Sequence, residues 1–286
     1  MSQQEPFPFA PLVERCFELA VDISAEQFEE HASAFMNRIG EKLGLTQTKT
    51  LEHWEIRIEK PKGSPLLKPK ATLYNILTIS HEEKSERRDC SIETLHLKPA
   101  TSSEPASLKF AQLKPQTSAI ISFEEAKRRL ITILSILHDT FGKDAVLQTT
   151  LSYWNDLYKF DNSHFQSGGI FNLSHTLRYF NDNSGMGAVV PPWNVVMNWA
   201  VQSRPGARVK LDIKGEWERI DVNRARNQLW TILEYLGKPS NDGVSSAECL
   251  AELDIAHAAI YEKFISILTP QALEYCKNGS LHNFTS

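Results

Sequence analysis

The stretch Ser245–Pro270, SSAECLAELDIAHAAIYEKFISILTP, decides the fold. Its apolar residues return at steps of three and four, which predicts a long helix with one stripe turned toward a partner surface. Ser245 followed by Glu248 is typical of a capping box, and Thr269-Pro270 is typical of the start of a second, short helix. The stripe consists of Leu250, Leu253, His257, Ile260, Phe264 and Ile267.

Two earlier segments start in the same way. Ser24 is followed three residues later by Gln27, and Ser122 is followed by Glu125. Apolar residues at helical spacing follow each pair, so we expect amphipathic helices that end near residue 43 and near residue 141. Each of the three helices then presents one apolar face that needs a surface to cover.

Runs with a period of two lie beside these helices and predict strands. In the first run, PLVERCFELAVDI, the residues Val13, Phe17, Leu19 and Val21 share one face. Arg15 falls on that apolar face, where we expect it either to extend toward solvent or to meet a buried acid. Further strands are expected over residues 51–59, 71–80, 90–97, 146–160, 195–202, 208–220 and 228–236.

The expected strands mostly follow one another in sequence, which favours antiparallel pairing with the helices packed on one face. We therefore predict an α+β fold in two parts, residues 1–110 and residues 111–286, which can still form one continuous domain. Residues 98–118, rich in Pro, Ser and Lys, are expected to be the boundary or a long surface loop. The repeated order of elements suggests an internal duplication.

Bulk properties exclude some classes of function. The 286 residues are 41% hydrophobic and 23% charged, as in an ordinary globular protein. A net charge of −4 argues against a general nucleic-acid or anionic-membrane surface. We find no N-terminal secretory signal, and the four cysteines are far apart with no C-x-x-C pair. We therefore expect a cytoplasmic protein with reduced thiols and no membrane-spanning segment.

The candidate site residues are polar groups on apolar elements. Tyr153, Asn155 and Asp156 interrupt an apolar strand, and His257 lies on the stripe of the last helix. Buried polar groups need partners, so we expect either a structural network or a site for a ligand or partner. We hypothesise that Asn155 and His257 belong to one network, and that His257 bonds to a strand carbonyl or a carboxylate.

Glu14 and Arg15 complete the set of candidate contact residues. Glu14 and Glu18 share a strand face about 13 Å apart. That separation exceeds the roughly 6.5–9.5 Å between the carboxylates of inverting glycosidases, so we expect no glycosidase pair.

Other chemistry lacks support in the spacing. The histidines show no metal-ligand pattern, and the glycine-bearing loops lack the context of a phosphate-binding loop. We therefore predict no catalytic residues, no metal and no cofactor. Five of the six tryptophans fall after residue 150, which leaves open either ordinary core packing or an aromatic-lined cavity between sheet and last helix.

Three segments together resemble one protein family. They are APLVERCFEL near the start, the helix Phe123–Phe141 with the following LSYWN, and LDIAHAAIYEKFISILTPQALEYC near the end. The chain is similar to a family of sporadically distributed bacterial proteins of comparable length and unassigned function. It departs from the family pattern at Ser152, where that pattern carries Arg, and at Asp156, where a basic residue is usual. The sporadic occurrence implies an accessory system such as anti-phage defence.

These observations favour a non-enzymatic interaction protein of an accessory bacterial system, with a protein partner. One alternative is a small-molecule or lipid-binding protein with a cavity between sheet and helices. The other is an enzyme whose dispersed site only the fold assembles. A nucleic-acid partner is not expected, and a homo-oligomer remains open.

Overall fold

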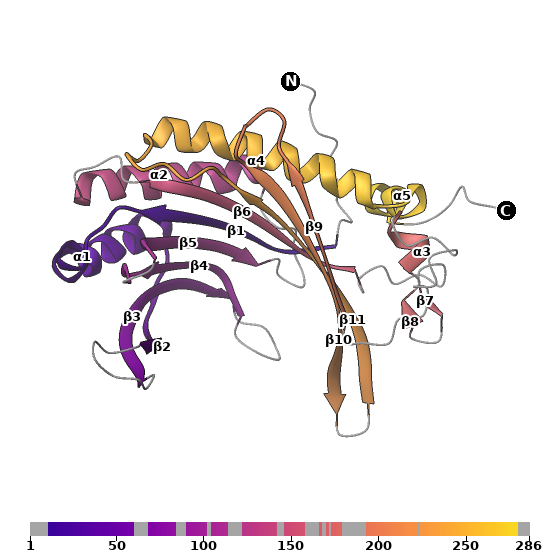
Figure 1. The fold of residues 1–286 in the computed structure, drawn as a ribbon, viewed down its shortest axis with the longest axis horizontal. Helices are drawn as coiled ribbons and strands as arrows, with labels where there is room; N and C mark the ends of the chain where they lie inside the picture. The colour runs from indigo at the N-terminus through magenta and orange to yellow at the C-terminus, as the bar shows by residue number, and fades with distance from the viewer. Residues whose placement is uncertain are drawn as a thin grey trace.

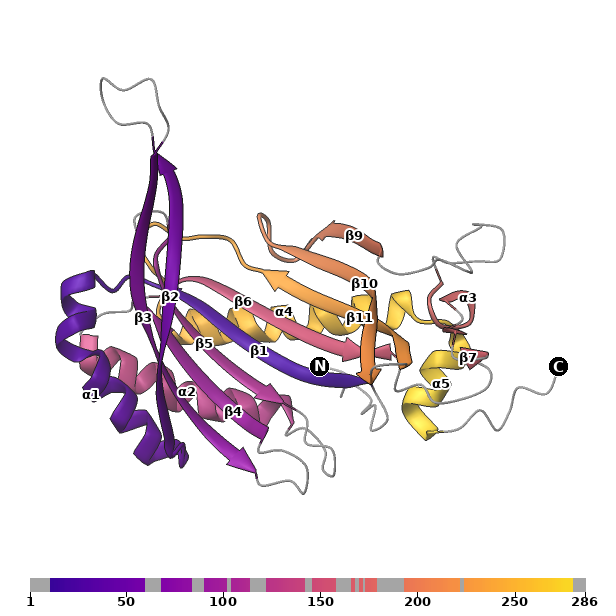
Figure 2. The same ribbon diagram turned by 90° about the horizontal axis from the view of Figure 1, so that it is seen from below.

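A nine-stranded antiparallel sheet carries the fold, and helices cover one of its two faces (Figures 1 and 2). The computed structural model describes residues 11–59, 68–83, 90–101, 104–113, 122–141, 146–157, 166–167, 170–171, 173–178, 193–221 and 224–279. Within these residues the predicted α+β class, with antiparallel strands and helices on one face, is confirmed.

The elements follow one another in two runs. The first run comprises β1 (Leu12–Val21), α1 (Ala25–Leu43), β2 (Gln47–Glu59), β3 (Lys68–Glu83), β4 (Cys90–Lys98), β5 (Ala106–Leu113) and α2 (Phe123–Phe141). The second comprises β6 (Val146–Asp156), β7 (Gln166–Ser167), β8 (Ile170–Phe171), α3 (Leu173–Thr176), β9 (Trp193–Ala200), β10 (Arg208–Asp221), β11 (Arg224–Leu236), α4 (Ser246–Ile267) and α5 (Pro270–Asn278).

The strand order shows that the two runs share one plan. The order is β2-β3-β4-β5-β1-β6-β11-β10-β9, with β7 and β8 in a separate two-stranded sheet. In each run the first strand pairs with the last strand of a meander that a helix then follows. The two first strands, β1 and β6, pair with each other at the centre. This matching topology supports the duplication that the sequence suggests, which stays a prediction.

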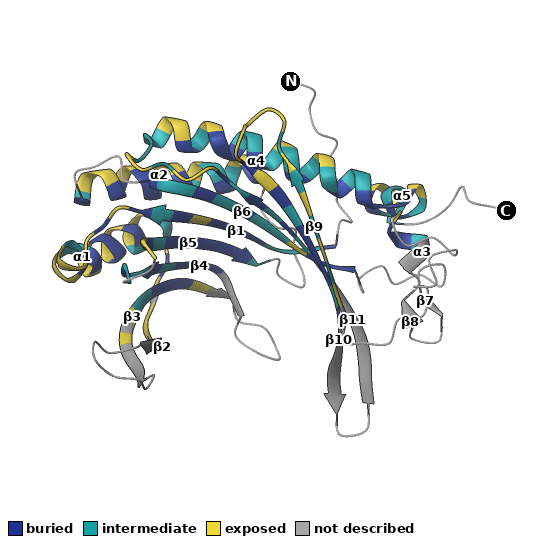
Figure 3. Ribbon diagram, in the orientation of Figure 1, coloured by how far each residue is buried: buried dark blue, intermediate teal, exposed yellow. Residues whose placement is uncertain are grey.

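The register separates the two faces of the central strands. Phe17 lies opposite Phe110 of β5 and Leu151 of β6, and all three are fully buried on the helix side. The rings of Phe17 and Phe110 stack with centroids 6.1 Å apart. Glu18 and Trp154 point to the other face and are exposed. Figure 3 shows buried segments in dark blue along β1, β5 and the helices that cover the sheet. The core therefore lies between the sheet and the helices α1, α2 and α4.

The helix starts match the sequence expectation. Capping boxes form at Ser24 and at Ser245, and the backbone N–H of Glu125 donates to the Ser122 hydroxyl. At Thr269 the side chain caps α5, which begins at a proline. These caps satisfy backbone donors that would otherwise lack partners at each helix start.

One strand contradicts the sequence expectation. Residues 98–118 were expected to form a loop or boundary, but β5 lies within them and pairs with both β1 and β4. The expected division between residues 110 and 111 falls inside β5, and the hydrogen-bonded sheet continues across it. The alternation of β5 is clear only in its own eight residues, and the Pro, Ser and Lys around it hide that pattern.

Candidate functional site

Arg15 lies on the helix side of β1 with only 5% of its surface exposed. Its guanidinium carbon is 5.3 Å from the ring centroid of Tyr153 and 5.8 Å from that of Phe123. Its Nη1 donates to the backbone carbonyl of Ser122 at 3.2 Å. The prediction that Arg15 extends toward solvent is therefore wrong. Two aromatic rings and a backbone carbonyl are among the groups that contact it, and the alternative of a buried acid stays a prediction.

His257 of α4 lies against the same rings. Its imidazole stacks on Phe123 with centroids 3.9 Å apart and planes 9° apart. The Tyr153 hydroxyl lies 2.5 Å from its Nδ1. Arg15 and Phe123, which are buried, and Tyr153 and His257, which are partly buried, thus form one cluster that connects β1, β6, α2 and α4.

The protonation states of this cluster follow from its burial. Burial lowers the pKa of His257 to about 4, with a contribution from the positive charge of Arg15 that Asp254 partly opposes. Burial raises the pKa of Tyr153 to about 12, although Arg15 acts in the other direction. Both groups are therefore neutral at pH 7, and they share one hydrogen bond whose donor is set by the tautomer of the imidazole. A neutral histidine with so low a pKa is a weak base near neutral pH.

The remaining candidate residues do not all lie on the same face of the sheet. The amide of Asn155, 3% exposed, donates to the backbone carbonyl of Tyr153 at 3.4 Å. The hypothesis that Asn155 and His257 belong to one network stays a prediction; both residues bond to Tyr153, Asn155 to its backbone carbonyl and His257 to its hydroxyl. Glu14 and Asp156 belong to the strand face opposite the cluster by the alternation of β1 and β6. Burial raises the pKa of Glu14, and Lys109 partly opposes this.

A second buried network, which the sequence did not predict, ties α2 to the sheet. The amide of Gln112 donates to Glu93 at 2.9 Å, and the Arg129 guanidinium donates to the other carboxylate oxygen at 2.6 Å. Nearby, Lys127 of α2 forms an ion pair with Asp254 of α4 at 2.6 Å. The network escaped prediction because Gln112 lies on β5, the strand that was expected to be a loop.

A third network joins α4 to the second half of the sheet. The Tyr235 hydroxyl donates to the carboxylate of Glu252, and Arg204 forms an ion pair with that carboxylate at 2.6 Å. Burial raises the pKa of Tyr235, and the bond to Glu252 adds to this effect. These three networks fix the helices on the sheet with paired polar groups.

The buried thiols are poorly suited to nucleophilic chemistry. Burial raises the pKa of Cys16 to about 12, of Cys249 to about 11 and of Cys276 to about 12. Thiolates are the reactive form, so these three cysteines are inert at neutral pH. Among the described residues, no group of three or more His, Cys, Asp or Glu side chains is placed to hold a metal ion.

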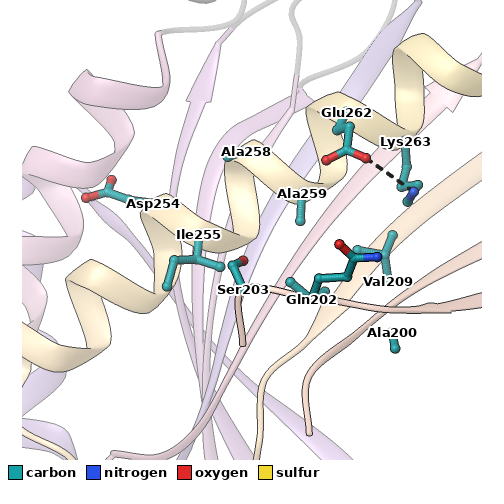
Figure 4. Close-up of a pocket in the computed structure, with 11 residues that line it drawn as sticks. Ala200, Gln202, Ser203, Val209, Asp254, Ile255, Ala258, Ala259, Glu262 and Lys263 are labelled. Carbon is teal, nitrogen blue, oxygen red and sulfur yellow. Dashed lines mark hydrogen bonds and ion pairs between the residues drawn. The ribbon is translucent and has the colours of Figure 1, made fainter. Parts of the chain in front are cut away.

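A groove of about 540 Å³ lies between α4 and the β9–β10 hairpin, and we call it the α4 groove. Figure 4 shows Ile255 and Ala259 on the side of α4 that faces Gln202 and Val209. No tryptophan is among the described residues that line this groove, so the aromatic-lined cavity between sheet and last helix stays a prediction. The groove is lined by Ala200, Val201, Gln202, Ser203, Val209, Asp254, Ile255, Ala258, Ala259, Glu262 and Lys263.

Charged side chains stand at one end of the α4 groove. Glu262 and Lys263 form an ion pair at 3.4 Å, and the Glu262 side chain is 75% exposed. The Lys263 ammonium lies 5.6 Å from the ring centroid of Trp199 on β9. An apolar floor of alanine, valine and isoleucine therefore meets a polar, solvent-exposed rim. That is the composition of a protein-contact surface with a polar edge.

Among the residues that the structure describes, no helix combines the length and the hydropathy needed to cross a bilayer. Comparison of the chain with models of protein families, with curated proteins and with solved structures found no match.

Proposed function

We propose that this chain is a non-enzymatic interaction protein that binds another protein through the α4 groove. The observation that carries the proposal is the incomplete cover over β9. On the helix side of β9, Val195, Met197 and Trp199 are only partly buried, although they pack against the core. Half-covered apolar side chains beside a groove favour contact with another molecule.

The titratable groups also support a binding role over an enzymatic one. His257 is neutral and bonded to Tyr153, and the Glu93 and Glu252 carboxylates are held in ion pairs with arginines. His257 and the two carboxylates thus each bond to a side chain of a neighbouring element or loop of the fold. Such pairing connects helices to strands, which is the expected role of a structural network.

The biological setting in this proposal rests on the sequence resemblance alone. The similar family is bacterial and sporadically distributed, so we place the protein in an accessory bacterial system, with anti-phage defence as the candidate process. We propose a cytoplasmic location for the same reason, together with the spacing of the cysteines.

The test is a pull-down from the native host with three baits. The wild-type chain and Ala251→Trp, which adds the same ring at an exposed position of α4 outside the groove, should retain the same partner. Ala259→Trp, which fills the groove, should lose that partner while melting within a few degrees of wild type. A partner that all three baits retain, or the bait alone in every case, would refute the proposal.

A small-molecule binder is the second candidate function. A volume of about 540 Å³ falls within the range of about 300–1,000 Å³ that is common for ligand sites. Native mass spectrometry of the purified chain distinguishes the two functions. A bound small molecule that Ala259→Trp excludes would favour this alternative over a protein partner.

A further inference from the structure

The first half of the molecule shows what kind of element covers the place equivalent to the α4 groove. By strand order, β3 corresponds to β9, β4 to β10, β5 to β11, and α2 to α4. In the first half α1 packs against both α2 and β3. The corresponding place in the second half lies between α4 and β9, and there the structure has the α4 groove.

The two covering helices correspond residue by residue. Aligning the cap Ser122 with the cap Ser245 places Glu125 on Glu248, and both glutamates donate a backbone N–H to their serine. The same alignment brings five buried positions of α2 onto five buried positions of α4. These pairs are Ala126 with Cys249, Leu130 with Leu253, Ile133 with Ala256, Leu137 with Ile260 and Phe141 with Phe264.

The burial of the aligned residues differs at one position near the contact between α1 and α2. Ile136 of α2 is 5% exposed, whereas its counterpart Ala259 is only partly buried and lines the α4 groove. Ile136, one helical turn before the Thr140 that Arg38 of α1 contacts, is thus matched by the small Ala259 beside a groove. The difference indicates that the second half has the floor of a helix-binding site, which no helix among the described residues covers.

The acidic residue of α2 that α1 contacts also has an acidic counterpart on α4. Arg38 of α1 donates to Asp139 at 3.2 Å and to Thr140 at 3.1 Å. The counterpart of Asp139 on α4 is the acidic Glu262, which lines the α4 groove. A cation that binds Asp139 in one half therefore has an equivalent carboxylate, exposed to solvent, in the other half.

Within its described residues, the chain's own segment between β6 and β9 contains one short helix. That helix, α3, is a single turn, and it contacts α5. The neighbouring Leu177 forms a bridge with Leu268 at the far end of α4 (Figure 1). The described part of this segment therefore lies at the α5 end of the molecule and leaves the α4 groove uncovered. Figure 2 shows β9 at one edge of the sheet.

We propose that the α4 groove receives an amphipathic α-helix of the partner protein, packed as α1 packs on α2 and β3. This inference rests on the proposed protein-binding function and adds the class of the partner segment. The helix presents an apolar stripe to Ile255, Ala259 and Val209, and it places a lysine or arginine beside Glu262. Helix-in-groove binding of this kind uses apolar anchors at helical spacing.

The α1 sequence itself provides the probe. A labelled synthetic peptide of residues 24–44, stapled on its exposed face to hold it helical, is titrated onto the full-length protein by fluorescence anisotropy. We expect saturable binding with one peptide per chain, because the protein's own α1 already fills the first site. Ala259→Trp should abolish the binding, whereas Ala251→Trp should leave it unchanged.

A charge exchange tests the contact at Glu262. An Arg38→Glu peptide should bind the wild-type protein at least about tenfold more weakly, because it places like charges together. The same peptide should regain that affinity on a Glu262→Arg protein. Reversal of the exposed Asp242 to Lys, outside the groove, is the matched control and should have no effect.

The outcomes separate this inference from the proposed function. Absence of saturable peptide binding, or binding that Ala259→Trp does not change, overturns the inference, even if the pull-down finds a groove-dependent partner. Peptide binding with all the expected variant effects, together with an empty pull-down, supports the helix-binding groove and removes the proposed function. A dimer that Ala259→Trp dissociates, measured by light scattering, would identify a second copy as the occupant and overturn the assignment to a partner protein.

Discussion

The buried His257 makes the stability of the fold depend on pH in a predictable direction. Its pKa is about 4 in the folded protein and 6.5 in an unfolded chain. Between these values the unfolded state binds more protons, so acidification favours unfolding. The stability that His257 contributes is fully present above pH 6.5 and is lost as the pH falls toward 4.

The size of the effect follows from the same two values. At pH 5 the unfolded imidazole is almost fully protonated, whereas the folded one is mostly neutral. At 1.36 kcal/mol per unit of pKa, the loss between pH 7.5 and pH 5 is about 2 kcal/mol. With an m-value of about 2 kcal/mol per molar, the urea midpoint should fall by about 1 M on this account alone.

The assay is urea unfolding of wild type and His257→Gln at pH 7.5 and at pH 5. The variant keeps a polar side chain at this place but cannot titrate, so its loss on acidification should be smaller than that of wild type by about 2 kcal/mol. The difference between proteins removes the contributions of Glu14 and His96, which are shifted in both. His81→Gln, at an exposed histidine, is the matched control. Equal losses in wild type and His257→Gln would refute the reasoning.

Three further predictions concern the buried polar groups. Tyr153→Phe leaves the Nδ1 of His257 without the Tyr153 hydroxyl as its hydrogen-bond partner, and the free energy of unfolding at pH 7.5 should fall by about 1–3 kcal/mol. A change near zero would show that the bond is not needed. Arg129→Ala leaves the Glu93 carboxylate without its cation and should cost about 3–5 kcal/mol, and adding Glu93→Gln should restore part of it. A double variant as unstable as the single one would contradict this account. In a Cys90→Ser background, a disulfide reagent at pH 8 should modify no thiol of the folded protein and all three after urea, namely Cys16, Cys249 and Cys276.

The sequence predicted the elements that have local signals. The caps at Ser24 and Ser245 and the apolar stripes predicted the covering helices. Both signals are local, because a cap and a period of 3.6 residues can each be recognised within a short stretch of sequence. Strands β1, β6 and β10 were found by their alternation. β5 was missed because proline, serine and lysine surround its eight residues.

The candidate site was predicted less completely, because it depends on register. Alternation placed Arg15 on the inner face, and the stripe of α4 placed His257 there too. The register of β1 and β6 pairs Arg15 with Tyr153, and this pairing places Tyr153 beside His257. That register could not be read from a single sequence. The α4 groove had no signal of its own. It becomes visible only when the halves are compared in three dimensions.

The pairing of β1 with β6 has a consequence for synthesis of the chain. The first half, through α2, emerges from the ribosome with its meander complete, but one side of β1 has no ladder partner until β6 follows. An open strand edge is a template for aggregation. A nascent chain stalled after α2 would therefore expose an aggregation-prone strand edge, and a separately expressed second half carrying β6 should rescue it by complementation.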